Sequence, residues 1–280
     1  MILIIKFGAL KFAYFIGRFV AFFYCLLPSV RKNASYYLEK KFPNCNHIKK
    51  FLHLYKLNLT FGKILIDRAI FGIKSKVNII SSRADINLCK SLYQKNNGLI
   101  ILSAHCGCWQ SAMSAFNLID DEKEKYVVYH QNKEDIDKHV HQLQKKESPV
   151  KFIEPNAFDG GIIEIMAALQ RGSLVCMMGD RVFGASNNFV EVNFLGAKIA
   201  LPFSIYRIAA TLNKPIAIIF FPYKKTGAVD TMIADYFFVK DGGKAAQNYV
   251  EYADRFSKAL ENFVKVYPYQ FYNYFNLWRK

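Results

Sequence analysis

A histidine, a glycine and a tryptophan follow directly on an apolar run in the middle of the chain. Residues 98–102 are short, continuously apolar and preceded by two asparagines, which predicts a buried strand that ends just before His105. Open α/β sheets carry their chemistry at this end of a strand, and an imidazole can take or give a proton near neutral pH. His105 is therefore a candidate general base, and a hydrogen bond from its ring to a loop is the alternative.

Two cysteines next to this histidine suggest other chemistry. Cys106 and Cys108 flank Gly107, an arrangement that would also suit a Cys/His nucleophile or a metal centre. A zinc centre needs further closely spaced ligands, and none of the six cysteines forms a C-x-x-C pair. We expect reduced thiols and no bound metal.

The elements that must position His105 alternate along the chain. After the turn at Gly107, apolar residues recur at helical spacing, and later segments repeat the change from apolar run to helical pattern. This alternation predicts an α/β fold with a central, mostly parallel sheet flanked by helices. The expected strands are 77–80, 99–103, 126–129, 174–178, 216–221 and 229–239, and the expected helices are 46–72, 84–93, 110–116, 162–170, 205–212 and 245–266.

The first thirty residues are almost wholly apolar but contain Lys6, Lys11 and Arg18. On a helix Lys11 and Arg18 are seven residues apart and lie nearly on one face, which favours a basic amphipathic helix in the membrane interface over a tilted span. We expect a membrane-associated helix over 1–30 and an α/β domain over 31–280. Basic pairs at 31–32 and 40–41 favour a cytoplasmic location for that domain.

Composition favours an anionic partner. The chain of 280 residues has a formal net charge of +16 and an aromatic content of 16%. The cations are scattered and no nucleic-acid-binding motif accompanies them, so we expect no nucleic acid partner. An anionic membrane surface accounts for the charge and the aromatic residues together, and a solvated basic surface is the alternative.

Several separated segments, taken together, resemble one known family. The segment His105-x-Gly107-x-Trp109-Gln110 is similar to the His-x-Gly-Asn-Trp-Glu motif of the bacterial lipid A biosynthesis (late) acyltransferases, a branch of the lysophospholipid and glycerolipid acyltransferase superfamily. Other segments follow the order of that family from residue 30 to residue 280, namely 31–34 with 38–43, 128–132, 179–181, 194–197 with 201–202, 212–216, and 268–275 with Trp278.

The resemblance implies that His105 is the catalytic base and that its neighbour at the fifth position is a carboxylate. This chain has Gln110 there, and an amide can orient an imidazole but cannot stabilise its charged form. Asp180 is the expected substitute carboxylate, with Glu154 and Glu164 as alternatives. The resemblance also implies substrate contacts, which we assign to Trp109, Asn132, Arg181 and Phe194.

The activity implied is transfer of a fatty acyl group from a thioester of acyl carrier protein or coenzyme A to a lipid or glycolipid acceptor. No further cofactor is expected, and the expected location is the cytoplasmic face of the bacterial inner membrane. Gln110 favours an alternative, a catalytically weakened relative that binds lipid as a scaffold or regulator. A thioesterase is a third possibility, which no G-x-S-x-G motif supports.

Overall fold

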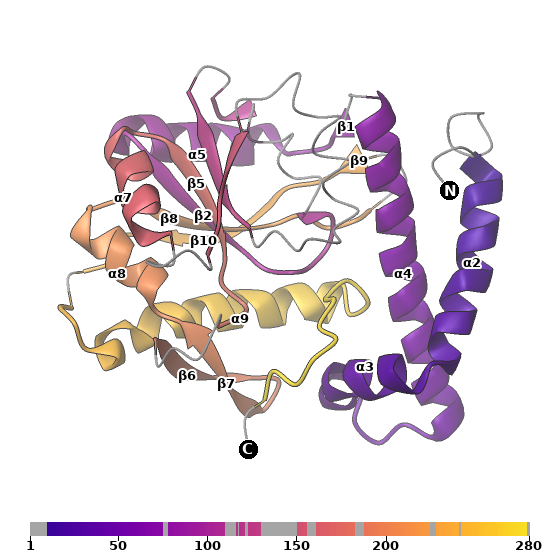
Figure 1. The fold of residues 1–280 in the computed structure, drawn as a ribbon. Coiled ribbons are helices and arrows are strands. Elements are labelled where there is room, and N and C mark those ends of the chain that lie inside the picture. Colours follow the sequence, from indigo (N-terminus) through magenta and orange to yellow (C-terminus); the bar gives the residue numbers. More distant parts are fainter. Residues whose placement is uncertain are drawn as a thin grey trace.

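A six-stranded sheet forms the centre of the computed structural model, which describes residues 10–74, 78–109, 116, 118–120, 123–129, 150–155, 161–182, 188–224, 228–240 and 242–278. The strand order is β10-β8-β2-β5-β3-β4, and only β10 runs antiparallel to its neighbour (Figure 1). The strands are β2 (Leu99–Ser103), β3 (Lys125–Val128), β4 (Val150–Ile153), β5 (Leu174–Met178), β8 (Ile216–Phe220) and β10 (Met232–Phe237).

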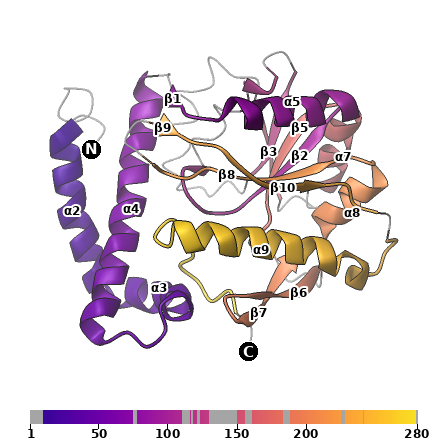
Figure 2. The same cartoon turned by 180° about the vertical axis from the view of Figure 1, so that it is seen from behind.

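Helices cover both faces of this sheet. Helix α5 (Arg83–Asn96) lies on one face and α9 (Val250–Val266) on the other, as the two opposite views show (Figures 1 and 2). Strand β2 is therefore buried at every position, since Ile101 faces the α5 side and Leu102 the α9 side. Helix α7 (Ile162–Gln170) directly precedes β5 in the chain, and helix α8 (Ser204–Thr211) directly precedes β8. Both helices lie at the same end of the domain (Figure 1).

A hairpin outside the main sheet packs on the far side of α9. Strands β6 (Phe189–Phe194) and β7 (Ala197–Pro202) are joined by Leu195 and Gly196, both with positive φ, as a tight two-residue turn requires. The remaining short elements are β1 (Asn78–Ile79), which pairs with β9 (Ala228–Val229), and the 3-10 helix η2 (Ala246–Tyr249).

Three helices precede the sheet: α2 (Leu10–Leu26), α3 (Pro28–Lys41) and α4 (His47–Lys74). Helices α2 and α4 run side by side, and α3 lies across their ends (Figures 1 and 2). The Asn58 amide of α4 donates to the Cys25 sulfur of α2 at 3.3 Å, and the Tyr14 hydroxyl donates to the buried Asp67. Helix α2 is thus held to the domain by specific polar contacts.

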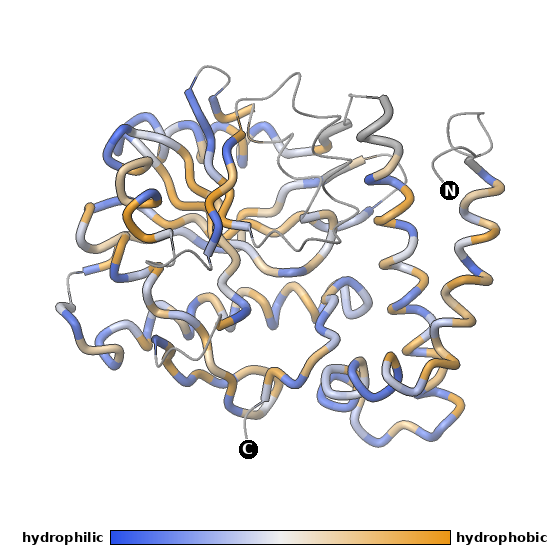
Figure 3. Tube along the Cα trace, viewed as in Figure 1, coloured by the Kyte–Doolittle hydropathy of each residue, from blue (hydrophilic) through white to orange (hydrophobic). Residues whose placement is uncertain are grey.

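The two faces of α2 differ in an unusual way. Small residues at every fourth position face the rest of the protein, and the large apolar side chains face outward. The inner residues are Ala13, Gly17, Ala21 and Cys25. The outer ones include Phe12, Phe15, Phe19, Phe22 and Phe23, each at least 44% exposed. Figure 3 shows hydrophobic colour along α2 as well as along the strands of the sheet. A water-soluble helix has the opposite pattern.

The length of α2 bears on whether this helix could cross a bilayer by itself. Within the described residues no single helix is both long and apolar enough to cross a bilayer, although α2 and α3 meet those criteria as a pair bent by 89°. Of the helix predicted over 1–30, the structure has Leu10–Leu26 as α2, while residues 28–30 begin α3 and residues 1–9, with Lys6, lie outside the described residues. The membrane attachment of this segment stays a prediction.

The predicted central, mostly parallel sheet flanked by helices is confirmed, although the strand predicted over 77–80 corresponds to β1, which lies outside the main sheet. Strands 99–103 and 174–178 and helix 162–170 have the bounds expected, and the strand predicted over 229–239 is divided into β9 and β10. Helix α3, strand β4 and the β6–β7 hairpin were not predicted. The helix expected over 110–116 lies outside the described residues apart from Phe116.

The close approach of α2 to α4 gives a test. A Cβ on Gly17 would lie 3.0 Å from Ile66 Cδ1, so we expect Gly17→Leu to lower the free energy of unfolding by about 1–3 kcal/mol through overpacking. A Cβ on Gly62 of α4 would meet no atom within 4 Å, and Gly62→Leu should maintain or raise stability. Denaturant unfolding in detergent measures the stability of the two variants. Equal losses in Gly17→Leu and Gly62→Leu would contradict the close contact between α2 and α4 at Gly17.

Candidate active site

Two neighbouring strands bring His105 and Asp180 together. Strands β2 and β5 are adjacent and parallel, with Ser103 opposite Met178 at their ends. His105 and Asp180 each follow two residues later, on the same edge of the sheet. The Gly179 amide donates to the Ser103 carbonyl at 2.8 Å and extends the ladder past the strands. The pair is therefore fixed by the register of the sheet.

The carboxylate of Asp180 binds both the ring and the backbone of His105. His105 Nδ1 lies 2.9 Å from Asp180 Oδ1 and 3.0 Å from Oδ2, and the His105 amide donates to Oδ2 at 3.3 Å. With the Nδ1 proton donated to the carboxylate, Nε2 is the ring atom that can accept a proton from a substrate. The Asp180 side chain is 2% exposed and that of His105 is 16% exposed, so the base has access to solvent and its partner does not.

The electrostatics of Asp180 favour its charged form. Burial alone would raise the pKa of this carboxyl group, but the charge and hydrogen bonds of His105, with a smaller contribution from Arg181, hold the pKa below its ordinary value. Asp180 is consequently a carboxylate at neutral pH, and it can stabilise a positive charge on the His105 ring.

Glycine at position 179 is required by the same packing. A Cβ there would lie 2.8 Å from Leu102 Cδ1 and 3.1 Å from Phe256 Cζ, closer than side chains ordinarily approach. The glycine lets the end of β5 lie against β2 and α9, which sets the direction in which Asp180 leaves the strand.

Arg181 extends the site on the exposed side of Asp180. Its Nε lies 3.9 Å from Asp180 Oδ2, and its guanidinium group lies over the Phe275 ring at 4.8 Å from the centroid. Within the described part of the chain, this buried Nε has no hydrogen-bond partner. A guanidinium held by an aromatic ring and only partly paired is suited to a phosphate or carboxylate group.

The loop after His105 is held from two directions. Gly107 has φ of 56° and a Cβ would lie 2.0 Å from the Phe221 carbonyl oxygen, so this position requires glycine. The Cys108 amide donates to that same oxygen at 2.6 Å, and the Gly107 amide donates to the Gln270 carbonyl at 2.8 Å. The loop is therefore fixed between the end of β8 and residues near the C-terminus.

Those C-terminal residues, 268–278, form what we call the C-terminal strap. Its Tyr272 amide donates to the His105 carbonyl at 3.0 Å, and Cys106 and Phe271 form an isolated β-bridge. The Gln270 side chain exchanges two hydrogen bonds with the Tyr223 backbone, at 2.8 and 2.9 Å. Sequence reasoning included this segment in the resemblance but did not predict that Gln270 and Tyr272 hold the site.

The structure weakens the case for a cysteine nucleophile. Burial raises the pKa of Cys106 well above its ordinary value and that of Cys108 to about 12, so both are thiols at neutral pH. Both side chains belong to the hydrophobic core.

The other predicted residues have different positions. Trp109 meets the His105 ring edge to face at 5.0 Å between centroids, so it lies at the site. Phe194 is fully buried and stacks on Trp278, which places it in the core beneath the strap and gives no support to its predicted role in substrate binding. Glu164 is exposed in the first turn of α7. Gln110 and Asn132 lie outside the described residues.

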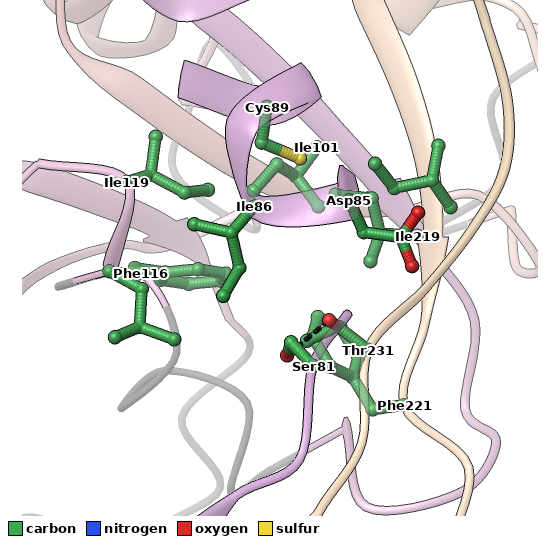
Figure 4. A pocket seen from close by; sticks show the side chains of 12 residues that line it. Ser81, Asp85, Ile86, Cys89, Ile101, Phe116, Ile119, Ile219, Phe221 and Thr231 are labelled. Atoms are coloured by element: carbon green, nitrogen blue, oxygen red, sulfur yellow. Dashed lines mark hydrogen bonds between the residues drawn. The ribbon is translucent and has the colours of Figure 1, made fainter. Parts of the chain in front are cut away.

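A small cavity lies under α5, on the other side of Phe221 from the loop. Ile101, Ile219 and Phe116 line it, with Ser81 and Thr231 hydrogen-bonded at its edge (Figure 4). The described residues enclose about 30 Å³ there, which is about the volume of one water molecule. Among the described residues, this cavity leaves no room for an acyl tail.

These features are those of an α/β enzyme with a carboxylate-oriented histidine at the carboxyl edge of its sheet. The bacterial lipid A biosynthesis acyltransferase family matches residues 2–280, and the chain belongs to this family. Among curated proteins no sequence matches it at a significant level. The family assignment confirms the resemblance and identifies the chain as a member of a family of acyltransferases that act on lipid.

The charge on Asp180 predicts how stability depends on pH. At pH 7 we expect Asp180→Asn to lower the free energy of unfolding by about 1–3 kcal/mol, because a buried charge-assisted hydrogen bond is lost. The folded pKa of Asp180 is depressed, so its contribution is complete above the unfolded pKa and is lost as the pH falls through the folded pKa. Denaturant titrations of the wild type and Asp180→Asn from pH 7 downward should show that the difference between their free energies of unfolding narrows below pH about 4. A difference in the free energy of unfolding that does not change with pH would mean that the charge of Asp180 contributes nothing to stability.

Proposed function

We propose that this protein transfers a fatty acyl group from an acyl thioester to a hydroxyl or amine of a lipid or glycolipid, with His105 as general base. The observation that carries the proposal is the contact of 2.9 Å between His105 Nδ1 and the buried Asp180. It orients Nε2 outward and supports a protonated ring, as general base catalysis requires.

In the proposed reaction, Nε2 of His105 removes the proton of the acceptor hydroxyl or amine while that oxygen or nitrogen attacks the thioester carbonyl carbon. The carbon–sulfur bond then breaks, and the imidazolium returns the proton to the leaving thiolate. The products are the acylated lipid and the free thiol of acyl carrier protein or coenzyme A. No covalent acyl-enzyme is needed.

Asp180 takes the role that a motif carboxylate has in the resemblance described above. Gln110 cannot stabilise charge on the imidazole, whereas Asp180 is ionised and in contact with it. Arg181 is proposed to bind a phosphate or carboxylate of one substrate, and Trp109 to border the acceptor. The exposed aromatic face of α2 is proposed to attach the protein to the cytoplasmic face of the inner membrane.

A second candidate function rests on Gln110. A family member that has lost part of its catalytic power would still bind lipid and act as a scaffold or regulator. This second function predicts that the wild-type protein binds lipid without measurable acyl transfer.

The role of His105 is tested by His105→Ala. We expect transfer to fall by at least ~10²-fold while the protein stays folded, with a lower melting temperature because the buried Asp180 loses its main partner. The measurement is acyl transfer from a radiolabelled acyl thioester to bacterial lipid extract in detergent. Equal rates for the two proteins would exclude His105 as the base, and an inactive wild type that still binds lipid would support the scaffold.

The assignment of Asp180 is tested with Gln110→Glu. Because His105 already has a carboxylate partner, we expect no gain in rate from Gln110→Glu alone, while Asp180→Asn lowers the rate by up to ~10⁴-fold. The pH profiles of kcat for the wild type and the three variants, including the double variant, measure this. A several-fold increase in Gln110→Glu would show that Asp180 does not fill the missing role.

A further inference from the structure

A cavity of about 300 Å³ lies between α3 and the start of α4, away from the His105 site. One face of α3, the connecting loop and the first turns of α4 enclose it. The residues that surround it are Arg31, Ser35, Leu38, Glu39, Phe42, Cys45, His47, Lys50, Phe51, His53 and Leu54. Neither the proposed reaction nor the family resemblance gives this cavity a role.

Its lining has two parts of different chemistry. Leu38, Phe42, Phe51 and Leu54 are apolar and buried or half-buried, while Arg31 and Lys50 are exposed cations. An apolar floor with cations at its edge fits a molecule that is apolar at one end and anionic at the other.

His53, one of two histidines in the wall, is not a further cation. Burial, Lys56 and Lys49 hold the pKa of His53 below its ordinary value, so the ring is neutral at pH 7. It lies 2.8 Å from the Tyr269 hydroxyl and stacks on Phe42. The positive charge for an anionic ligand therefore comes from Arg31 and Lys50.

Neither cation is firmly engaged elsewhere. Arg31 Nη2 donates to the Leu26 carbonyl at 3.1 Å, which leaves its other donors for a ligand. Lys50 pairs with Glu39 at 3.0 Å, but both side chains are about half exposed, and such ion pairs contribute little. A phosphate can replace Glu39 as the partner of Lys50.

The wall of the cavity contacts the apolar surface of α2. Phe51 in its wall meets Phe22 of α2 edge to face at 5.9 Å between centroids. Ile48 and Leu52, on the same turns of α4, are 73% and 48% exposed. A lipid in the cavity would thus have its anionic end at the cations and its chains along the surface that we propose contacts the bilayer.

We propose that this cavity binds one anionic phospholipid of the membrane, with its phosphate between Arg31 and Lys50 and its acyl chains along Phe51 and Phe22. The apolar floor distinguishes such a lipid from a free phosphate. The inference rests on the proposed attachment to membranes but not on acyl transfer.

One cysteine provides a reporter inside the cavity. Cys45 lines it and is partly exposed, whereas the other five cysteines are buried. A maleimide should therefore modify Cys45 first in the native protein. A bound lipid should slow this reaction, and the ratio of the rates without and with lipid measures occupancy in the wild-type chain.

The test uses short-chain dihexanoyl lipids below their micellar concentration. We expect dihexanoyl-phosphatidylglycerol to slow the labelling of Cys45, and dihexanoyl-phosphatidylcholine and glycerol 3-phosphate at equal concentration to have little effect. Equal protection by phosphatidylcholine would overturn the role of the cations, and equal protection by glycerol phosphate would overturn the choice of a lipid. Unchanged labelling in all three solutions would overturn the site.

Charge-matched variants make the test specific. Arg31→Gln with Lys50→Gln should weaken the apparent affinity for phosphatidylglycerol by roughly 5-fold for each charge removed, or about 25-fold together. The control is Lys32→Gln with Lys63→Gln, which removes the same charge from the same two helices outside the cavity lining. An equal loss in the control would mean general attraction to a basic surface and would contradict the proposal. Transfer assayed in detergent reports separately on the His105 site.

Discussion

The functional geometry of this protein depends on one ion-pair hydrogen bond at the edge of a parallel sheet. His105 and Asp180 are 75 residues apart in the chain, and only the adjacency of β2 and β5 brings them together. The carboxylate is buried, which would ordinarily favour its neutral form, yet the histidine holds it ionised. The histidine therefore keeps the buried carboxylate charged, and the strand register keeps the two groups in contact.

The residues around His105 and Asp180 fix the positions of this pair. Gly107 permits a close backbone contact, Gly179 leaves room for the side chains of Leu102 and Phe256, and the C-terminal strap binds the loop after His105. The strap is itself tied to the N-terminal helices, since the Tyr37 hydroxyl donates to the Pro268 carbonyl at 2.7 Å and that of Tyr274 to Asn58 at 2.8 Å. The helices proposed to meet the membrane and the loop that carries the base are parts of one hydrogen-bonded assembly.

The sequence predicted the buried strands well because their apolar residues are continuous, as in β2 and β5. It did not predict α3, whose buried face consists of Ala34, Tyr37 and Leu38 on an otherwise polar helix. The pairing of His105 with Asp180 was anticipated through the resemblance, but its geometry needed the order of the strands, because β3 and β4 separate β2 from β5 in the chain. Phe194 was expected to contact substrate, and it is buried against Trp278, because the sequence alone does not say what covers a strand.

The strap also gives the protein an order of assembly. Chains are synthesised from the N-terminus, so the residues of α2 to α4 and of the sheet are made before residues 268–278. Until those residues arrive, the carbonyl of His105 and the amide of Gly107 lack the partners that Tyr272 and Gln270 supply. The N-terminal helices that we propose attach to the membrane are thus synthesised well before the residues that complete the loop of the base.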